Sequence, residues 1–483
     1  MTLEIQSRYL GNPHVRFDEG EVAPAAKPRR GSLFGNARHL IATVALCSAT
    51  ISAATEASTI VTQTINNVEW RFQLDASDGT ATLGLGQDAD DSYACPKSAQ
   101  VSAANIPWTF TGEDGVFYTV TKIADNAFIN HTVLTGTVLI PESVTEIGAY
   151  AFGGDSGTGL TGFAGATGVM TWGDNAFSDN SNMTGTFPDM SRAVSIGLSP
   201  FQSCSKMTGE LKLGDFITTL PKWAFYDCYY TGTAVIPASV TSIGNDYGAF
   251  QSCKNLEAIW VKGKTAAASG QTYTEVYCPR FARDCTSLKM FLIGQNTKAM
   301  RFSAPESKNR MLKGDTGVQV FVPANEYWSE LDVTHIGGDN KLWYYGPEQE
   351  FDLAIDDDLM RVTFTPTTVN ALTNALAWAP SFKTYFNLDT HISVTNTLDL
   401  TDVAITEGMV SGVTFDRLMF SAKTQDQLNA ILAAFPASTP ISIDPTGLTQ
   451  NMVIPDTYTN VHVKTVPGVA IKRTSSGFII LFR

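Results

Sequence analysis

Apolar residues return at a fixed interval between residues 121 and 281. The clearest marker is a phenylalanine in segments such as "TKIADNAF" (121–128) and "TEIGAYAF" (145–152). Its first six copies, separated by 24, 25, 24, 24 and 25 residues, are followed by a seventh after an insertion: Phe128, Phe152, Phe177, Phe201, Phe225, Phe250 and Phe281. A period of this length predicts a repeat architecture.

A second motif keeps the same period: "LTGTVLIP", "MTGTFPDM", "MTGELKLG" and "YTGTAVIP" begin at residues 134, 183, 207 and 230. Within the last copy, residues 233–236 predict a short strand, which Pro237 ends because proline cannot donate to a ladder. Val240, Ile243 and Phe250 then point into the coil. A 24-residue coil cannot bury its own apolar residues, so we expect coils stacked strand beside strand at about 4.8 Å and Phe on Phe.

The residues from 236 to 256 resemble the BspA-type leucine-rich repeat, roughly I-P-x-x-V-x-x-I-x-x-x-A-F-x-x-C-x-x-L, with a two-residue insertion. The resemblance covers about residues 105–300. It implies a right-handed solenoid in a secreted or cell-surface protein that binds other macromolecules, in some members as an adhesin. The resemblance implies no catalytic residue in this chain. The chain departs from the family pattern in its "TG" element, in degenerate copies at 153–170 and 183–194, and in an insertion at 264–277.

The expected fold is a β-rich repeat solenoid with a C-terminal α+β region. Residues 55–120 are an N-terminal β cap with a hairpin at Asp78-Gly79, and residues 121–300 are the solenoid. Residues 301–347 form its C-terminal cap, in which 318–331 predict a last strand, a proline and a short helix.

Residues 348–483 lose the 24-residue period, but two of their segments, 362–389 and 418–444, are alike at an offset of 56 residues. Each predicts a strand, a helix of about ten residues, a proline and a strand. We therefore expect a duplicated β-α-β unit, closed by strands in "VHVKTV" and "GFIILFR". No family is recognised here, and a continuation of the solenoid with larger repeats stays open.

The first 54 residues resemble an export signal. Basic residues precede the apolar run "LIATVALCSATISAA" (40–54), which is too short to span a bilayer of about 30 Å and ends in small residues suited to cleavage. A buried core helix is the alternative, and the 39-residue stretch before the run is long for a signal. Removing residues 1–54, with six basic and four acidic side chains, changes the net charge from −14 to −16. No later segment predicts a membrane span, and the acidic surface opposes binding of nucleic acid.

Six cysteines follow the leader: Cys95, Cys204, Cys228, Cys253, Cys278 and Cys285. Cys204, Cys228 and Cys253 each lie three residues after a repeat phenylalanine, which favours a structural ladder of buried thiols at a coil corner. A disulfide between Cys278 and Cys285 is the alternative at the irregular seventh coil. No C-x-x-C pair is present, so a zinc site is not expected.

The sequence contains no constellation that indicates catalysis. The four histidines after the leader share no motif spacing, and H-E-x-x-H, G-x-S-x-G and phosphate-binding glycine loops are missing. Three consecutive aspartates at 356–358 fit a solvated linker better than a cation site. We expect no enzyme activity, no metal and no cofactor.

Aligning the predicted strands places one outward-facing residue per coil in a column: Leu139, Lys212, Val235, Trp260 and Leu292. A neighbouring column holds Thr137, Glu210, Thr233, Ala258 and Met290. Exposed apolar surface often marks a contact site, and Trp is favoured at binding hot spots. Two alternatives stay open: these residues merely suit strands, or the C-terminal region folds over this face.

Three functions are consistent with these observations. The first is a secreted or surface repeat protein that binds a protein or glycan, for example host matrix or a neighbouring cell, and so acts in adhesion. The second is an exported enzyme whose solenoid is an accessory binding module. The third is a self-assembling structural component of the cell surface.

Overall fold

The computed structural model describes residues 59–86, 93–263, 273–300, 310–337, 339–394, 398, 400, 403, 405–447, 451–466, 471–473 and 479–480. The segment from Ala57 to Arg483 forms one compact unit. The predicted leader (1–54) lies outside the described residues, as does the 264–272 part of the predicted insertion.

Three antiparallel strands open the described chain: β1 (Thr59–Ile65), β2 (Val68–Asp75) and β3 (Thr80–Leu83). The predicted turn at Asp78-Gly79 joins β2 to β3, and Gly79 has a φ of 69°, which glycine adopts without strain. β3 then pairs in parallel with β6 (Phe117–Ile123), and β5 (Thr109–Thr111) lies antiparallel along β6. The hairpin sheet therefore continues directly into the repeats.

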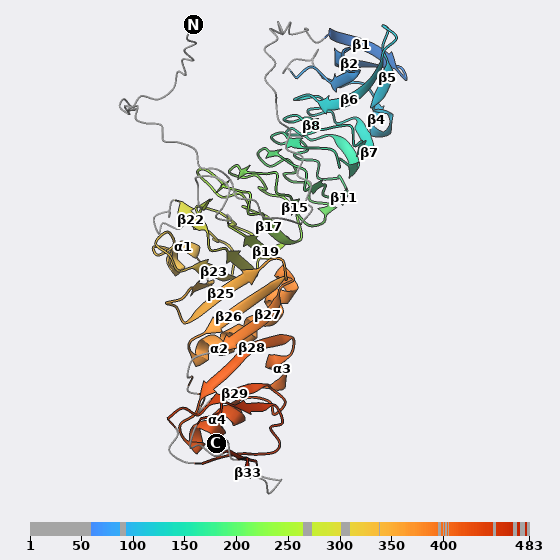
Figure 1. Cartoon of the computed structure of the whole chain (residues 1–483). Coiled ribbons are helices and arrows are strands. Elements are labelled where there is room, and N and C mark those ends of the chain that lie inside the picture. Colours follow the sequence, from blue (N-terminus) through green and yellow to red (C-terminus); the bar gives the residue numbers. More distant parts are fainter. Residues whose placement is uncertain are drawn as a thin grey trace, which may run out of the picture. The chain divides into compact units, whose positions relative to one another are not determined.

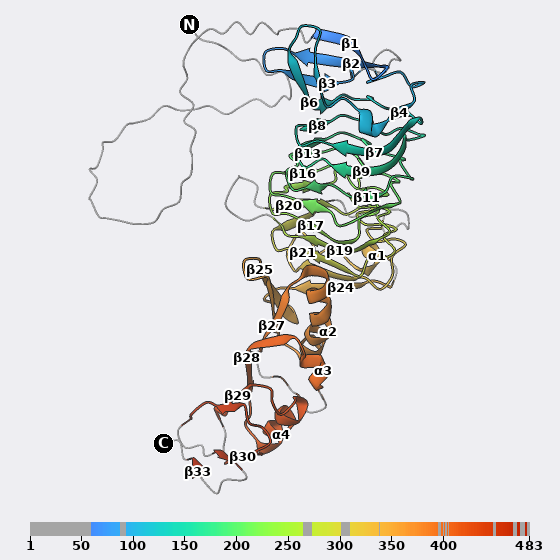
Figure 2. The ribbon, with the colours of Figure 1, turned by 90° about the vertical axis from the view of Figure 1, so that its right-hand side faces the viewer.

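The repeat coils contribute strands to two series of parallel ladders, which Figures 1 and 2 show as stacked arrows. The first series comprises the segments just before the repeat phenylalanine. After β6 it contains β8 (Glu146–Ile147), β10 (Thr171–Trp172), β13 (Ser195–Ile196), β16 (Thr219–Leu220), β18 (Ser242–Ile243), β20 (Thr274–Tyr277) and β22 (Thr297–Met300).

The second series comprises the "TG" segments and their continuation. It contains β4 (Val101–Ser102), β7 (Leu134–Ile140), β9 (Gly159–Gly165), β11 (Gly185–Thr186), β12 (Asp189–Met190), β14 (Met207–Thr208), β15 (Lys212–Leu213), β17 (Gly232–Ile236), β19 (Leu256–Val261), β21 (Met290–Ile293), β23 (Gln319–Pro323) and β24 (Lys341–Tyr345). A 3-10 turn, η1 (Ala103–Asn105), follows β4. Strand β17 ends at Ile236, directly before Pro237, as the sequence predicts.

The C-terminal end of the repeats differs from its prediction in two respects. The predicted short helix around 325–331 is a run of turns, followed by the four-residue helix α1 (Val333–Ile336). β23 is also not the last strand, because the aromatic strand β24 pairs in parallel with it. The turns allow Trp328 to bury its ring and donate its indole N–H to the Thr297 hydroxyl at 3.0 Å.

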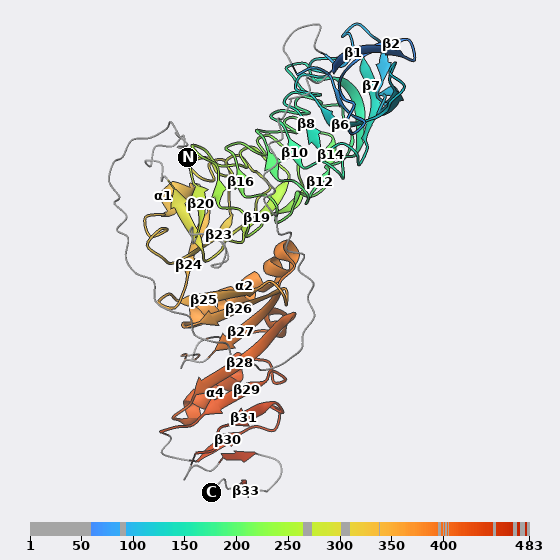
Figure 3. The same ribbon diagram turned by 45° about the horizontal axis from the view of Figure 1, so that its top comes forward.

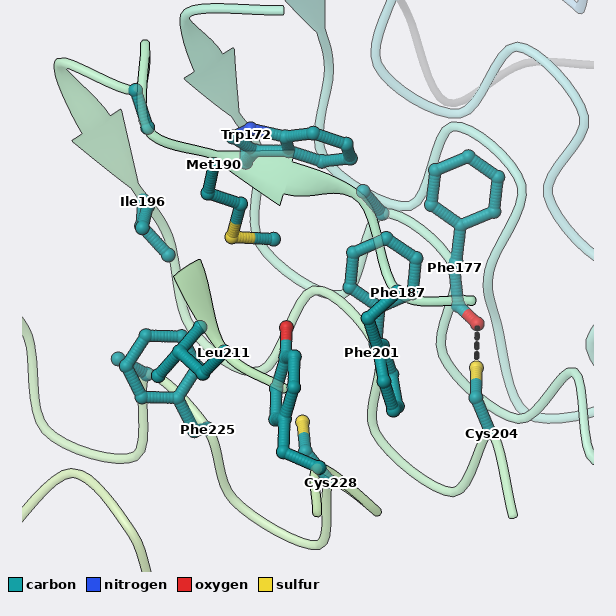
Figure 4. Close-up of a cluster of buried hydrophobic side chains, with 14 of the residues drawn as sticks. Trp172, Phe177, Phe187, Met190, Ile196, Phe201, Cys204, Leu211, Phe225 and Cys228 are labelled. Atoms are coloured by element: carbon teal, nitrogen blue, oxygen red, sulfur yellow. Dashed lines mark hydrogen bonds between the residues drawn. The ribbon is translucent and has the colours of Figure 1, made fainter. Parts of the chain in front are cut away.

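The repeat phenylalanines form the centre of the coils. All seven are at most 1% exposed. Three successive pairs, Phe128–Phe152, Phe152–Phe177 and Phe177–Phe201, stack at centroid distances of 4.9, 4.8 and 5.2 Å with interplanar angles of 13° or less. Figure 4 shows this packing around Phe177 and Phe201. Such offset stacking adds to the burial of each ring and fixes the spacing of the coils.

The cysteines that follow these rings donate to the preceding coil. The Sγ atoms of Cys204, Cys253 and Cys285 reach the carbonyl oxygens of Phe177, Phe225 and Phe250 at 3.1, 2.8 and 2.9 Å. Figure 4 shows the first of these contacts. Cys228 is equally buried, but its Sγ donates to the Tyr226 carbonyl of its own coil at the longer distance of 3.6 Å. The six described cysteines are free thiols, so Cys278 and Cys285 do not form the alternative disulfide.

In two other coils an asparagine or an aspartate takes the place of the ladder cysteine. Asn180 lies three residues after Phe177, and its Nδ2 donates to the carbonyls of Phe152 and Phe177 at 2.8 and 2.9 Å. Asp315 is 1% exposed, and both of its carboxyl oxygens are buried without a hydrogen-bond partner. Burial, with a smaller contribution from Asp284, raises the pKa of Asp315 to about 8. At neutral pH Asp315 is therefore a neutral carboxylic acid, like the neutral cysteine and asparagine side chains at the corresponding positions of other coils.

The C-terminal region forms a six-stranded sheet in the order β25-β26-β27-β28-β29-β31. Its elements are β25 (Phe351–Asp356), β26 (Arg361–Pro366), α2 (Val369–Phe386), β27 (Asp389–Val394), α3 (Glu407–Val410), β28 (Val413–Ser421), α4 (Gln425–Ala434), β29 (Ile441–Asp444) and β31 (Val461–Val463). Strands β30 (Met452–Ile454), β32 (Ile471–Arg473) and β33 (Ile479–Ile480) form a small separate sheet. From β26 to β31 all neighbours in the larger sheet are parallel, and Figure 3 shows it from β25 onward.

Each of the two similar segments forms a strand, a helix and a strand, but the helices differ in length. α4 has ten residues and ends before Pro436, as predicted, whereas α2 has 18 and continues through Pro380. A proline inside a helix removes one hydrogen bond and costs about 3 kcal/mol. Buried aromatic residues on both sides of Pro380, Trp378 and Phe382, offset this cost by holding the helix against its neighbours.

Candidate binding surface

The outer face is the side of the second ladder series that points away from the coil interior. Alternation along β19 separates the two sides: Ile259 and Val261 belong to the core of the coils, whereas Ala258 and Trp260 belong to a second core. β21 repeats this pattern, with Met290 and Leu292 in the second core. The predicted column therefore does point away from the coils.

The prediction that this column is exposed is correct at one end and wrong at the other. Leu139 is 59% exposed and Lys212 is exposed, while Val235 is half-buried. Trp260 is 3% exposed and Leu292 is fully buried. The adjacent column changes in the same way, from exposed Thr137 and Glu210 through half-buried Thr233 to buried Ala258 and Met290.

Helix α2 is the element that covers the buried end, which is the second alternative left open by the sequence. The Phe386 ring meets the Trp260 ring edge-on at 5.8 Å between centroids. Trp378 and Phe382 contact Phe321 at 4.9 and 5.3 Å, and Phe321 is the register partner of Leu292 on the next strand. The same face of α2 also packs on the C-terminal sheet, where Phe382 lies 5.2 Å from Phe364. Because the apolar face of α2 buries aromatic side chains against both sheets, this part of the outer face is covered.

A groove with a volume of ≈ 480 Å³ lies where α2 ends against the outer face. The coils contribute Glu210, Lys212 and Glu257 to its lining, and the helix end contributes Tyr385 and Asn387. The hydroxyl of Thr233, another lining residue, donates to the Tyr385 carbonyl and ties the helix end to the coils. The groove joins the covered and the free parts of the outer face.

The free part of the outer face extends from β7 to β15 and is mainly uncharged. Its exposed side chains besides Leu139 are mostly threonines: Thr135, Thr137, Thr161, Thr184, Thr186 and Thr208. Lys212 on β15 pairs in register with Asp189 on β12. Hydrogen bonds from Ser191, and then the charge of Lys212, hold the pKa of Asp189 below its ordinary value.

The histidines lie on separate elements. His131 is buried beside Cys95 and the Pro96 carbonyl, and burial lowers its pKa, so it is neutral. His335 contacts Asp332 at 2.8 Å near α1, and His391 contacts Asp416 at 2.7 Å between β27 and β28. His462 is exposed on β31. Among the described residues, no group of three or more His, Cys, Asp or Glu side chains could hold a metal ion.

The three consecutive aspartates end a strand and start a turn instead of forming a linker. Asp356 closes β25 and contacts Arg361 at 3.6 Å, and Asp357 pairs with Lys262 at 3.1 Å. In the described part of the chain, every helix is too short or too polar to cross a membrane.

Comparison with solved structures finds two weak likenesses. The pneumococcal vaccine antigen PcpA is 14% identical, with 85% of this chain and 99% of that chain covered and a TM-score of 0.33. A leucine-rich repeat protein from Bacteroides ovatus is also 14% identical, with 82% and 97% covered and a TM-score of 0.22. No curated protein sequence matches the chain.

Comparison with protein families gives a specific match. The BspA type leucine rich repeat region matches in six copies, over residues 116–189 and 171–304. These ranges contain the stacked phenylalanines from Phe128 to Phe281 and the cysteine ladder from Cys204 to Cys285. Residues 116–304 are therefore a leucine-rich repeat region of the BspA type.

Proposed function

We propose that this chain is an exported surface protein that binds another macromolecule, a protein or a glycan, and so acts in adhesion. The binding surface is the free outer face from β7 to β15, together with the groove at the end of α2. The proposal takes the stacked coils as the right-handed solenoid that the resemblance implies, which presents this face as a rigid platform.

The observation that carries the proposal is the division of the outer face. From Val235 onward the column is progressively sealed by the chain's own helix, whereas Leu139 remains 59% exposed with threonines around it. A partner therefore meets Leu139 and Lys212 first. Trp260 no longer qualifies as a contact across this face, because Phe386 occupies the position that a partner would need.

Binding is proposed in preference to catalysis because the groups that could do chemistry are dispersed. The groove holds two carboxylates and one ammonium, and each histidine lies on a different element. The proposal therefore includes no enzyme activity and no cofactor. A protein or glycan partner suits the net charge of −14 better than nucleic acid, which an acidic surface repels.

A binding screen with the full chain tests this function. Immobilised matrix proteins and glycan arrays serve as probes, and Leu139→Arg and Lys212→Glu alter the free outer face. The matched control is Val194→Arg, because Val194 is 46% exposed directly before β13 in the other ladder series.

We expect both outer-face variants to lose at least tenfold in affinity for a captured partner, and the control to bind normally. Unchanged binding by Leu139→Arg and Lys212→Glu would overturn the assignment of this surface. Self-association of the purified chain without any ligand would instead favour a structural component of the cell surface.

A further inference from the structure

A second cavity lies at the carboxyl ends of β19 and β21, where the repeat region meets β25. Its volume is ≈ 370 Å³, within the range of small-ligand pockets. The loops after the two strands contribute Lys262, Gln295 and Asn296, and β25 contributes Asp352. It shares no lining residue with the groove at the end of α2.

Trp260 lines this cavity and carries an unused donor. The side chain is 3% exposed, and its Nε1 atom is buried without a hydrogen-bond partner. A buried donor without an acceptor is destabilising, because it has lost its hydrogen bond to water without replacing it. Trp343, three strands further along the ladder, shows the usual arrangement, because its Nε1 donates to the Gln319 side chain at 2.8 Å. An acceptor atom supplied by a ligand in the cavity would remove the cost at Trp260.

The remaining lining groups offer both donors and acceptors. Asp352 accepts from the Leu353 N–H at 2.8 Å through one carboxyl oxygen only, and among the described residues it forms no ion pair. The amide group of Gln295 can donate and accept. Tyr345 contributes its ring, because its hydroxyl already donates to the Ile293 carbonyl at 2.6 Å.

The charges in the cavity disfavour an anion. Lys262 is neutralised by Asp357, with Nζ and Oδ2 3.1 Å apart, and its ammonium lies 4.8 Å from the centre of the Trp260 ring. Asp352 then leaves the cavity with one negative charge. A phosphate or carboxylate ligand would be repelled, whereas hydroxyl groups, which donate and accept, match this mixed lining.

We propose that this cavity binds a neutral saccharide unit, with a sugar oxygen accepting from Trp260 Nε1 and sugar hydroxyls donating to Asp352. Trp260, Tyr345 and Leu353 form part of the apolar lining of the cavity, as in mixed aromatic and polar ligand pockets. The site is distinct from the outer face and does not depend on the proposed function.

The test follows the indole N–H signals of the full chain by ¹⁵N NMR after selective labelling of tryptophan. Glucose, galactose, mannose, N-acetylglucosamine and the disaccharides lactose and cellobiose are added separately at millimolar concentrations. We expect at least one of them to shift a single indole signal, and that signal to be missing from the spectrum of Trp260→Phe. Trp260→Phe should bind that sugar at least about fivefold more weakly, as expected for a lost hydrogen bond.

Trp343→Phe is the matched control, since it removes a partnered indole N–H outside the cavity lining and should leave sugar binding unchanged. Ala354→Trp is a second variant that spares the core, because Ala354 lies exposed at the cavity on β25 and a larger side chain would fill the space. Binding that survives Ala354→Trp, or the absence of any shift of the Trp260 signal with all six sugars, would overturn the proposal.

Discussion

Phe386, the last residue of α2, lies edge-on against Trp260 of β19, with 5.8 Å between the ring centroids. This contact joins residues more than 120 positions apart in the sequence. It shows that the C-terminal region is part of the same hydrophobic structure as the repeats. The repeat region presents two kinds of outer face, one sealed by its own chain and one free.

Because α2 covers one end of the outer face, we expect its buried residues to stabilise the molecule strongly. Phe382 is fully buried between Phe321 on the coils and Phe364 on the C-terminal sheet. Phe382→Ala should lower the free energy of unfolding of this region by about 3–5 kcal/mol. Urea denaturation measures the change. The control is the adjacent Lys383→Ala, which removes only an exposed surface pair with Asp389 and should change the stability little. Equal losses in the two variants would show that α2 does not pack as described.

The buried carboxyl of Asp315 predicts a dependence of stability on pH. In the unfolded chain an aspartate loses its proton near pH 4, whereas the pKa of folded Asp315 is raised to about 8. Between these values the unfolded state binds fewer protons, so the contribution of Asp315 makes stability fall as pH rises, by at most about 1.4 kcal/mol per pH unit.

Asp315→Asn should remove this slope and stabilise the chain at pH 7 and above, because Asn180 shows that an amide fits the same rung. Urea denaturation at pH 5 and pH 8 measures both effects. Asp215→Asn, at an exposed position, serves as the control. A wild-type slope that persists in Asp315→Asn would mean that other groups cause it.

The cysteine ladder predicts unequal effects of the same substitution. Cys253 and Cys228 are both fully buried, but the Sγ of Cys253 donates at 2.8 Å whereas that of Cys228 is 3.6 Å from its acceptor. Cys253→Ala should therefore cost more than Cys228→Ala, by up to about 1 kcal/mol, because the hydrogen bond that it removes is shorter. Thermal and urea denaturation of the two variants provide the comparison. A larger loss in Cys228→Ala would contradict the ladder.

Pro380 predicts a stabilising substitution. It is exposed within α2, where proline removes a helix hydrogen bond. Pro380→Ala should restore this bond and raise the free energy of unfolding by about 1–3 kcal/mol. Ala377→Gly, on an exposed position of the same helix, should instead lower it by about 1 kcal/mol. Differential scanning calorimetry would register both shifts. A destabilised Pro380→Ala variant would indicate that the proline sets a bend that the packing needs.

The repeats could be predicted because their residues carry the period directly. Phe128 to Phe281 mark the stack, and Pro237 marks the end of β17. The length of α2 could not be predicted, because Pro380 ordinarily ends a helix and only the buried rings on both sides of it override that rule.

The covered outer face had one signal in the sequence. α2 carries one broad apolar face, including Leu372, Trp378, Phe382 and Phe386, which indicates that the helix packs against other apolar elements. The burial of Asp315 also had a signal in the sequence. The segment "DTGV" (315–318) aligns with "CTSL" (285–288), so Asp315 takes the position of Cys285. The cavity at Trp260 had none, because it is formed by loops and a strand that are distant in sequence.

Labelling of single introduced cysteines tests the division of the outer face most directly. Thr137→Cys and Ala258→Cys place a thiol in the same predicted column, at an exposed and at a fully buried position. The six described cysteines are buried, and burial raises the pKa values of their thiols, so they do not compete for a maleimide reagent at neutral pH; Cys47→Ser removes the remaining one. We expect Thr137→Cys to react at the rate of a free thiol and Ala258→Cys to react only after denaturation. Equal rates at the two positions in the folded chain would contradict the covering of the outer face by α2.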